Sequence, residues 1–251
     1  MSGAVVCGFW DPESGAAGLG WDIAGSRGGL LLRDGVVAPA RTAIETSGKS
    51  ATLSLEADGG SAEAELKPRP APSPLASQGF AAEGSVPEGA SCRAIVRLSG
   101  SGTLRYEGHL TRWASDPTGA AAVLRHMALP ASEGGLLIAL AAGAPGAESH
   151  AGELSAAWLL EADGTIAEYP EALFSTQYDP QGHPTRAGLE LWSASEDAPP
   201  MRAAGTSLDG ALAPDGDRDV SAAIMRTSAE GFAGLGSYVI WRAGARAGAG
   251  G

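Results

Sequence analysis

The sequence is poor in the residues that mark several large classes of protein. Its 251 residues include no asparagine, two lysines, two cysteines and four histidines, and the formal net charge is −12. Two cysteines, Cys7 and Cys92, are too few for a disulfide framework and lie outside any CxxC motif, so we expect buried free thiols. The acidic charge argues against a protein that binds nucleic acid through clustered lysine and arginine.

Long apolar segments are also lacking. No run approaches the roughly 20 apolar residues of a membrane-spanning helix, and the first residues, MSGAVVCGFWDPE, have neither the basic nor the apolar region of a signal peptide. These features predict a soluble, cytoplasmic protein with no membrane span.

The common cofactor and nucleophile motifs are incomplete. The stretch GLGWDIAGSRGG (18–29) has Ile23 where a dinucleotide fingerprint needs its third glycine, and TSGKS (46–50) has Ala43 where a phosphate loop needs its first. No GxSxG nucleophile motif occurs. The histidines lack the spacing of metal ligands; they are His109, His126, His150 and His183. We therefore expect no cofactor and no metal.

What the sequence does contain is many short β-rich segments separated by turn residues. Glycine (37) and proline (16) interrupt the chain too often for long helices. Alternating or β-branched patterns predict strands and an all-β fold, a sandwich or a barrel. The segments are 52–57, 62–67, 93–98, 103–113, 120–129, 134–142, 153–161, 187–194, 219–227 and 236–242.

One stretch occurs twice. LEADGGSAE (55–63) and LEADGTIAE (160–168) share seven of nine letters. Asp-Gly between alternating segments is a strong hairpin signal, because a type I′ turn needs positive φ at both central residues. We predict hairpin tips at Asp58-Gly59 and Asp163-Gly164. Whether the two hairpins also record a duplicated fold stays open, because AGLG (17–20 and 233–236) repeats at a different offset.

Proline-rich composition suggests a domain boundary. Four prolines fall within KPRPAPSP (67–74), which favours an extended linker. We predict a smaller N-terminal β-lobe over 1–66, a linker over 67–90, a larger C-terminal barrel over 91–242 and a loose tail over 243–251.

Aromatic residues with polar tips are spread over the predicted strands. Tryptophan and tyrosine combine a large apolar surface with a hydrogen-bonding group and suit the lining of a cavity, although filling a core is the alternative for any single residue. In TLRYEGHLTRW (103–113), one face carries Tyr106 and Leu110 and the other carries His109 and Thr111. A barrel of about eight strands has room for a small ligand.

Several segments together resemble a known family. The run YEGHLTRW, GELSAAWLLEADGTIAEYP, STQYDPQGHPTRAGLELW and GFAGLGSYVIWR, over about 100–242, is similar to the second half of the two-lobed lipocalin-like (calycin) proteins that include carotenoid 1,2-hydratase (hydroxyneurosporene synthase) and Diels–Alderase-type cyclases. GFWDPESGAAGLGWDIAGSRGG resembles a shortened first half. The resemblance implies two antiparallel β-barrels, or a barrel plus a smaller β-lobe, with a polyene, terpenoid or polyketide bound in or between them.

The chain departs from the hydratase pattern at one position that matters for the chemistry. Where hydratase-like members resemble GYxDHNWG, alignment on Trp113 puts Leu110 and Thr111 at the Asp and His positions. Protonation of an alkene needs a strong acid, whereas a cyclisation needs mainly a shaped cavity and a hydrogen bond. The departure therefore favours a cofactor-free cyclase or isomerase over a hydratase.

The candidate site combines polar and aromatic residues. As catalytic hydrogen-bond donors we predict His109, Tyr106 and Arg125, and as substrate-binding residues Trp21, Trp113, His126, Trp158, Tyr178, Trp192 and Tyr238. Two other functions remain open: a carrier or sensor of the same apolar small molecule, and an interaction module without a cavity. The protein is expected to be a monomer or a homodimer.

Overall fold

The computed structural model describes residues 3–11, 13–69, 72–75, 86–118, 121–143, 153–195, 199–215 and 218–243. These residues form strands and turns without a helix, which confirms the all-β prediction. It follows that the described residues contain no helix long and apolar enough to cross a membrane.

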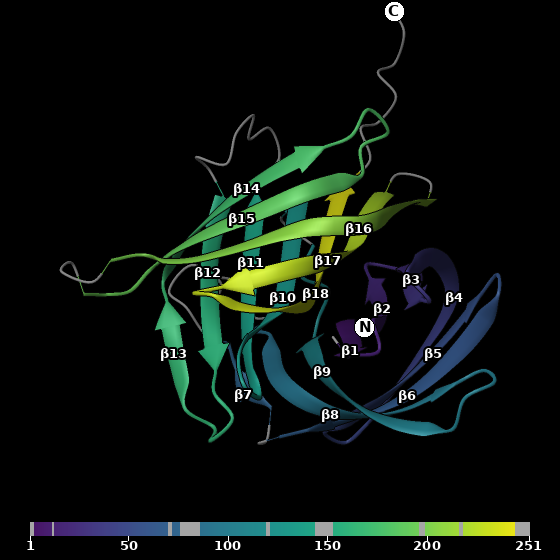
Figure 1. Ribbon diagram of the computed structural model, residues 1–251. Helices are drawn as coiled ribbons and strands as arrows, with labels where there is room; N and C mark the ends of the chain where they lie inside the picture. Colours follow the sequence, from purple (N-terminus) through teal and green to yellow (C-terminus); the bar gives the residue numbers. More distant parts are fainter. Residues whose placement is uncertain are drawn as a thin grey trace, which may run out of the picture.

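The N-terminal part of the chain forms one closed barrel. Its sheet has the order β6-β5-β4-β3-β2-β1-β9-β8-β7, and a further pairing of β6 with β8 closes eight of these strands into a ring (Figure 1). The strands are β1 (Ala4–Asp11), β2 (Ala16–Ile23), β3 (Ser26–Arg33), β4 (Val36–Ser47), β5 (Ser50–Ala57), β6 (Gly60–Pro68), β7 (Ser73–Pro74), β8 (Glu88–Leu98) and β9 (Thr103–Trp113).

The C-terminal part forms a second, nearly closed barrel. Its sheet has the order β13-β12-β11-β10-β18-β17-β16-β15-β14, and the gap between β12 and β14 is bridged by a hydrogen bond from the Ala172 amide to Ser155 Oγ at 3.4 Å. The strands are β10 (Val123–Ser132), β11 (Gly135–Gly143), β12 (Glu153–Leu160), β13 (Ile166–Tyr169), β14 (Glu171–Tyr178), β15 (Pro184–Trp192), β16 (Met201–Asp215), β17 (Arg218–Ala229) and β18 (Phe232–Ala243).

The boundary between the barrels differs from the predicted linker at 67–90. Strands β8 and β9 belong to the first barrel, because β8 pairs with β6 and β9 pairs with β1. The proline-rich segment is therefore an excursion within the first barrel, and one of its residues, Leu75, is fully buried against the second. The prediction failed because proline marks a break in backbone pairing and does not show which strands pair on either side of it. The predicted tail beyond Ala243 lies outside the described residues.

The duplicated Asp-Gly sequences make two different turns. Asp58-Gly59 joins β5 to β6 directly, since Ala57 pairs with Gly60, whereas Asp163-Gly164 lies in a longer loop between β12 and β13. Only the glycine of each pair has positive φ, so neither is the type I′ turn that we predicted. Positive φ at both central residues occurs instead at Ala24-Gly25, Asp34-Gly35 and Glu230-Gly231.

Both barrels are filled with side chains. The interior of the first contains Cys7, Cys92 and aliphatic residues, and that of the second is rich in alanine around Met127 and Met225. Both thiols are free and buried, as predicted, and burial raises the pKa of Cys92 to about 12.

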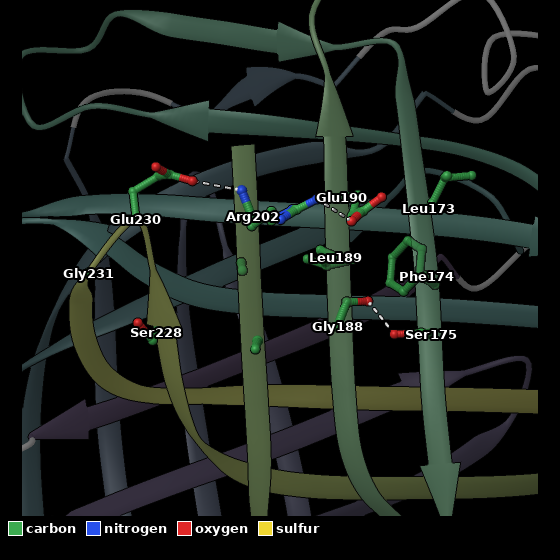
Figure 2. A pocket seen from close by; sticks show the side chains of 12 residues that line it. Leu173, Phe174, Ser175, Gly188, Leu189, Glu190, Arg202, Ser228, Glu230 and Gly231 are labelled. Carbon is green, nitrogen blue, oxygen red and sulfur yellow. Dashed lines mark hydrogen bonds and ion pairs between the residues drawn. The ribbon is translucent and has the colours of Figure 1, made fainter. Parts of the chain in front are cut away.

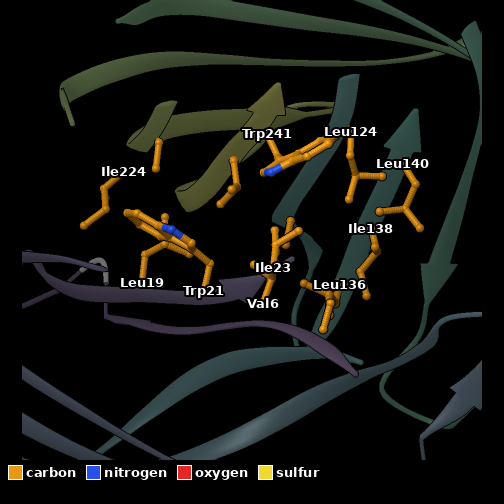
Figure 3. Close-up of a cluster of buried hydrophobic side chains, with 14 of the residues drawn as sticks. Val6, Leu19, Trp21, Ile23, Leu124, Leu136, Ile138, Leu140, Ile224 and Trp241 are labelled. Atoms are coloured by element: carbon orange, nitrogen blue, oxygen red, sulfur yellow. The ribbon is translucent and has the colours of Figure 1, made fainter. Parts of the chain in front are cut away.

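A third hydrophobic core joins the barrels through their outer faces (Figure 3). Trp21 of the first barrel and Trp241 of the second lie in it, and both are at least 97% buried, with exposed fractions of 1% and 3%. Trp21 has room because its cross-strand partner is Gly28, where a Cβ atom would lie 2.6 Å from the indole ring. The docking of the barrels thus depends on a large ring opposite a residue without a side chain.

The Trp21→Ala variant tests how much this core stabilises the fold. Because the indole is buried, its removal is expected to lower the free energy of unfolding by about 3–5 kcal/mol. Trp192, which is 39% exposed on the second barrel, gives a matched control, and Trp192→Ala should cost less than about 1 kcal/mol. Urea denaturation followed by far-ultraviolet circular dichroism measures both, and equal losses would contradict the assignment.

Candidate functional site

A column of four rings crosses the boundary between the barrels. Trp10 on β1 stacks on His109 of β9 with centroids 5.8 Å apart, and His109 stacks on His126 of β10 at 5.5 Å. Trp113 meets His126 edge-on at 6.1 Å. Three residues predicted for the site, His109, His126 and Trp113, are therefore brought together, although they come from both barrels.

The two histidines form reciprocal hydrogen bonds across the boundary. His109 of the first barrel pairs through Nε2 with Ser237 Oγ of the second at 3.0 Å. His126 of the second barrel pairs through Nε2 with Thr111 Oγ1 of the first at 2.9 Å. The His109 ring fits over β1 because its cross-strand partner is Gly8, where a Cβ atom would lie 2.9 Å from Nε2.

Both imidazoles are held neutral. Burial lowers the pKa of His126 to about 3, and burial with the neighbouring His126 lowers the pKa of His109 well below its ordinary value. Among the described residues neither Nδ1 atom has a hydrogen-bond partner. A neutral imidazole can accept or donate one hydrogen bond at this nitrogen, according to its tautomer, but it is a poor acid.

A small cleft reaches the outer end of this column. It has a volume of about 180 Å³ and opens where β1, β8 and β9 meet β10, β11 and β18. Its apolar lining includes Trp10, Pro130, Leu136 and Phe232, and its carboxylates are Glu107 and Glu133. Arg69 Nη2 donates to Glu107 at 2.8 Å. Trp10 both lines the cleft and stacks on His109, so it connects the cleft to the buried histidines.

A larger hollow lies on the outer face of the second barrel (Figure 2). Its volume is about 650 Å³, and it crosses β14 to β17. Its charged residues interact with one another: the Arg202 side chain pairs with Glu190 at 3.1 Å, and the Arg202 backbone amide donates to the Glu230 carboxylate at 2.8 Å. The hollow therefore has the larger volume, but none of its described lining residues directs a buried, unpartnered polar group into it.

A separate buried polar network occupies one end of the second barrel. Arg125, on the inward face of β10, donates from Nε to both Glu153 oxygens at 3.1 and 3.2 Å. Its Nη1 donates to Tyr178 Oη at 3.1 Å and to Tyr238 Oη at 3.2 Å. Three predicted site residues, Arg125, Tyr178 and Tyr238, thus meet here, at the end of β10 away from the cleft.

The remaining predicted site residues do not converge with these groups. Tyr106 points into the first barrel, where it hydrogen-bonds Ser14 Oγ at 3.1 Å and stacks on Phe9. Trp21 and Trp158 lie in the core between the barrels, and Trp192 is exposed. The proposed trio of His109, Tyr106 and Arg125 is therefore divided among three places, because Tyr106 and His109 alternate across β9 and Arg125 faces into the other barrel.

Sequence reasoning missed residues of both sites. Trp10 and Phe232 line the cleft, and Glu153 pairs with Arg125. Trp10 belonged to the aromatic pattern, and a signal for Glu153 was the need of a buried arginine for a carboxylate. Phe232 follows a turn and carried no signal. Within the described residues, no three histidine, cysteine, aspartate or glutamate side chains form a group that could hold a metal ion.

Comparison with known proteins places this arrangement among other two-barrel structures. No family model and no curated protein matches the chain. A candidate AttH from Nitrosomonas europaea is similar over 95% of this chain and 91% of that chain, with a TM-score of 0.62 and 13% identity. Kievitone hydratase from Nectria haematococca is similar over 97% of this chain and 89% of that chain, with a TM-score of 0.56 and 8% identity. At these identities the likeness shows a shared lipocalin-like fold alone.

The buried histidines make stability depend on pH. Because their pKa values are lower in the folded protein than in the unfolded chain, the unfolded chain binds more protons below about pH 6.5, and stability falls as the pH falls. Between pH 7 and pH 5 each histidine is expected to cost about 2 kcal/mol. His126→Gln should remove about half of this loss in urea denaturation.

His183 provides the control for that measurement. It is part-exposed, with Nδ1 3.4 Å from an Asp179 oxygen, and lies away from the barrel boundary. His183→Gln should keep the pH dependence of the unmodified protein. An unchanged pH dependence in His126→Gln would show that the His126 imidazole is not buried in its neutral form.

Proposed function

We propose that the protein binds one end of an apolar biosynthetic intermediate, such as a polyene, terpenoid or polyketide, in the cleft between its barrels. We further propose that it acts there as a cofactor-free cyclase or isomerase. The observation that carries this proposal is the double role of Trp10, which lines the cleft and stacks on the buried His109. The resemblance to lipocalin-like cyclases and the fold shared with a hydratase support the ligand class.

Packing favours the cleft as the position of the ligand. Because side chains fill the interiors of both barrels, the space between the barrels is the better place for an apolar group. The cleft volume corresponds to about six groups the size of a water molecule, at roughly 30 Å³ each. It therefore holds one end of a longer molecule, whose remainder would lie over Phe232 and Ala233 at the exposed rim.

The proposed chemistry depends mainly on the shape of the cleft. A shaped apolar cleft lowers the entropy cost of folding a flexible chain. The fully buried His109 lies behind Trp10 and does not line the cleft, so its neutral imidazole supports the position of Trp10 and does not protonate an alkene. Hydration is the second candidate because Glu107 and Glu133 supply carboxylates at the cleft, one of them beside Arg69. A carrier or sensor of the same molecule would use the cleft without chemistry.

The Phe232→Ala variant tests the binding site. Phe232 lines the cleft and is 38% exposed, so its removal should weaken binding while the core between the barrels stays intact. Titration with an apolar fluorescent dye is expected to show a dissociation constant raised about five- to ten-fold, from the loss of roughly 1 kcal/mol of apolar contact. Val36→Ala removes a side chain that is 67% exposed on the first barrel and should leave dye binding unchanged. Equal affinity in Phe232→Ala and the unmodified protein would place the ligand elsewhere.

Native mass spectrometry of protein purified from its producing organism identifies the physiological ligand. Denaturing extraction should release a polyene, terpenoid or polyketide, and incubation of the emptied protein with the precursor should yield a cyclised or isomerised product. A precursor returned unchanged would assign the carrier function, and a hydrated product would assign the hydratase function. A protein that is purified empty and binds no apolar dye would contradict all three.

A further inference from the structure

The polar network at the far end of the second barrel leaves two N–H groups of Arg125 without a described acceptor. Arg125 is 7% exposed and has five N–H groups, of which Nε and Nη1 account for three through their bonds to Glu153, Tyr178 and Tyr238. No described residue accepts a hydrogen bond from its Nη2. Nη2 is not one of the buried side-chain atoms that lack a partner, so its two N–H groups are open to solution and available to a ligand.

Tyr178 adds another free donor at the same place. Its oxygen accepts from Arg125 Nη1, and among the described residues nothing accepts its own proton. The Tyr178 side chain is 40% exposed, so a molecule from solution can reach it. The second tyrosine differs, because Tyr238 is fully buried and its hydroxyl is hydrogen-bonded to Thr176 Oγ1 at 2.8 Å. Either hydroxyl can be the donor in this bond.

Two arginines lie at this end of the barrel. Arg125 pairs with Glu153, whereas Arg242 lies over the Tyr178 ring, 5.2 Å from its centroid, and forms no ion pair with any described residue. A monoanionic acceptor would satisfy both the free donors and the free charge.

We propose that Arg125, Tyr178 and Arg242 form a second binding site, which takes the carboxylate of a small organic acid. The carboxylate has two oxygens that can accept from Arg125 Nη2 and from the Tyr178 hydroxyl, while Arg242 supplies the compensating charge. This site is independent of the cleft, since Arg125 lies near the start of β10 and the cleft residues Pro130 and Ser132 lie at its end.

Isothermal titration of the full chain with benzoate, and with benzamide as its neutral analogue of the same shape, tests the site. Benzoate should bind with one-to-one stoichiometry and at least about ten-fold more tightly than benzamide, because only benzoate brings a negative charge that can pair with Arg242. Equal affinities, or no binding of benzoate, would overturn the proposal.

Two variants locate the site without removing the buried Arg125. Tyr178→Phe removes a single hydroxyl from a part-exposed ring, and Arg242→Gln removes one charge; each should weaken benzoate binding by roughly five-fold or more. Arg226→Gln removes a charge from the exposed face of β17 and should leave the affinity within about two-fold. Full affinity in both Tyr178→Phe and Arg242→Gln would overturn the assignment.

The cleft variant separates this site from the proposed function. Phe232→Ala should reduce dye binding and leave benzoate binding unchanged, whereas Tyr178→Phe should do the reverse. Loss of benzoate binding in Phe232→Ala, with the fold retained by circular dichroism, would show that the carboxylate binds in the cleft and would overturn the second site.

Discussion

The structure depends on the packing of two sheets through their outer faces. A strand in a barrel normally has one face inside and one in water, but here the outer faces of β1, β2, β9, β10 and β18 are covered by the other barrel. Strand β1 is consequently apolar on both faces, and the burial of Trp21 against Gly28 is possible only where the second barrel covers the outer face. The fold is thus a single body made from three cores.

The same packing explains why polar groups are found where they are. His109 and Thr111 alternate with inward residues on β9, and an isolated barrel would leave them in water. Docking of the second barrel buries them, and reciprocal bonds to Ser237 and His126 replace the lost water. Removing one partner of such a pair leaves the other unsatisfied, which makes the polar contacts specific for one docking geometry.

Much of the fold could be predicted from the sequence, and the reason is local. Alternation and turn residues identified strands such as 103–113 and 236–242, and the predicted strands 120–129 and 134–142 correspond to β10 (Val123–Ser132) and β11 (Gly135–Gly143). The domain boundary could not be found, because the pairing of β6 with β8 is a long-range contact. The turn type at Asp58-Gly59 was also missed, since the same dipeptide fits more than one turn.

The candidate sites were predicted in part. His109 and His126 come together, and so do Arg125, Tyr178 and Tyr238, because buried polar residues must find partners wherever the fold places them. Their division into two sites was not predictable. It depends on which face of β10 lies inside the second barrel and which lies against the first, and the sequence did not define the barrels. Trp10 lines the cleft and stacks on His109 only because β1 pairs with β9 and lies against the second barrel.

The closed ladder of the first barrel also isolates its two thiols kinetically. Cys7 and Cys92 are the only cysteines in the chain, and both face the interior of the barrel whose eight strands form an unbroken ring. A thiol reagent reaches them only when that ring opens, while opening of the second barrel alone leaves them protected. Their rate of chemical labelling therefore reports the opening of the first barrel alone, without the need for a substitution.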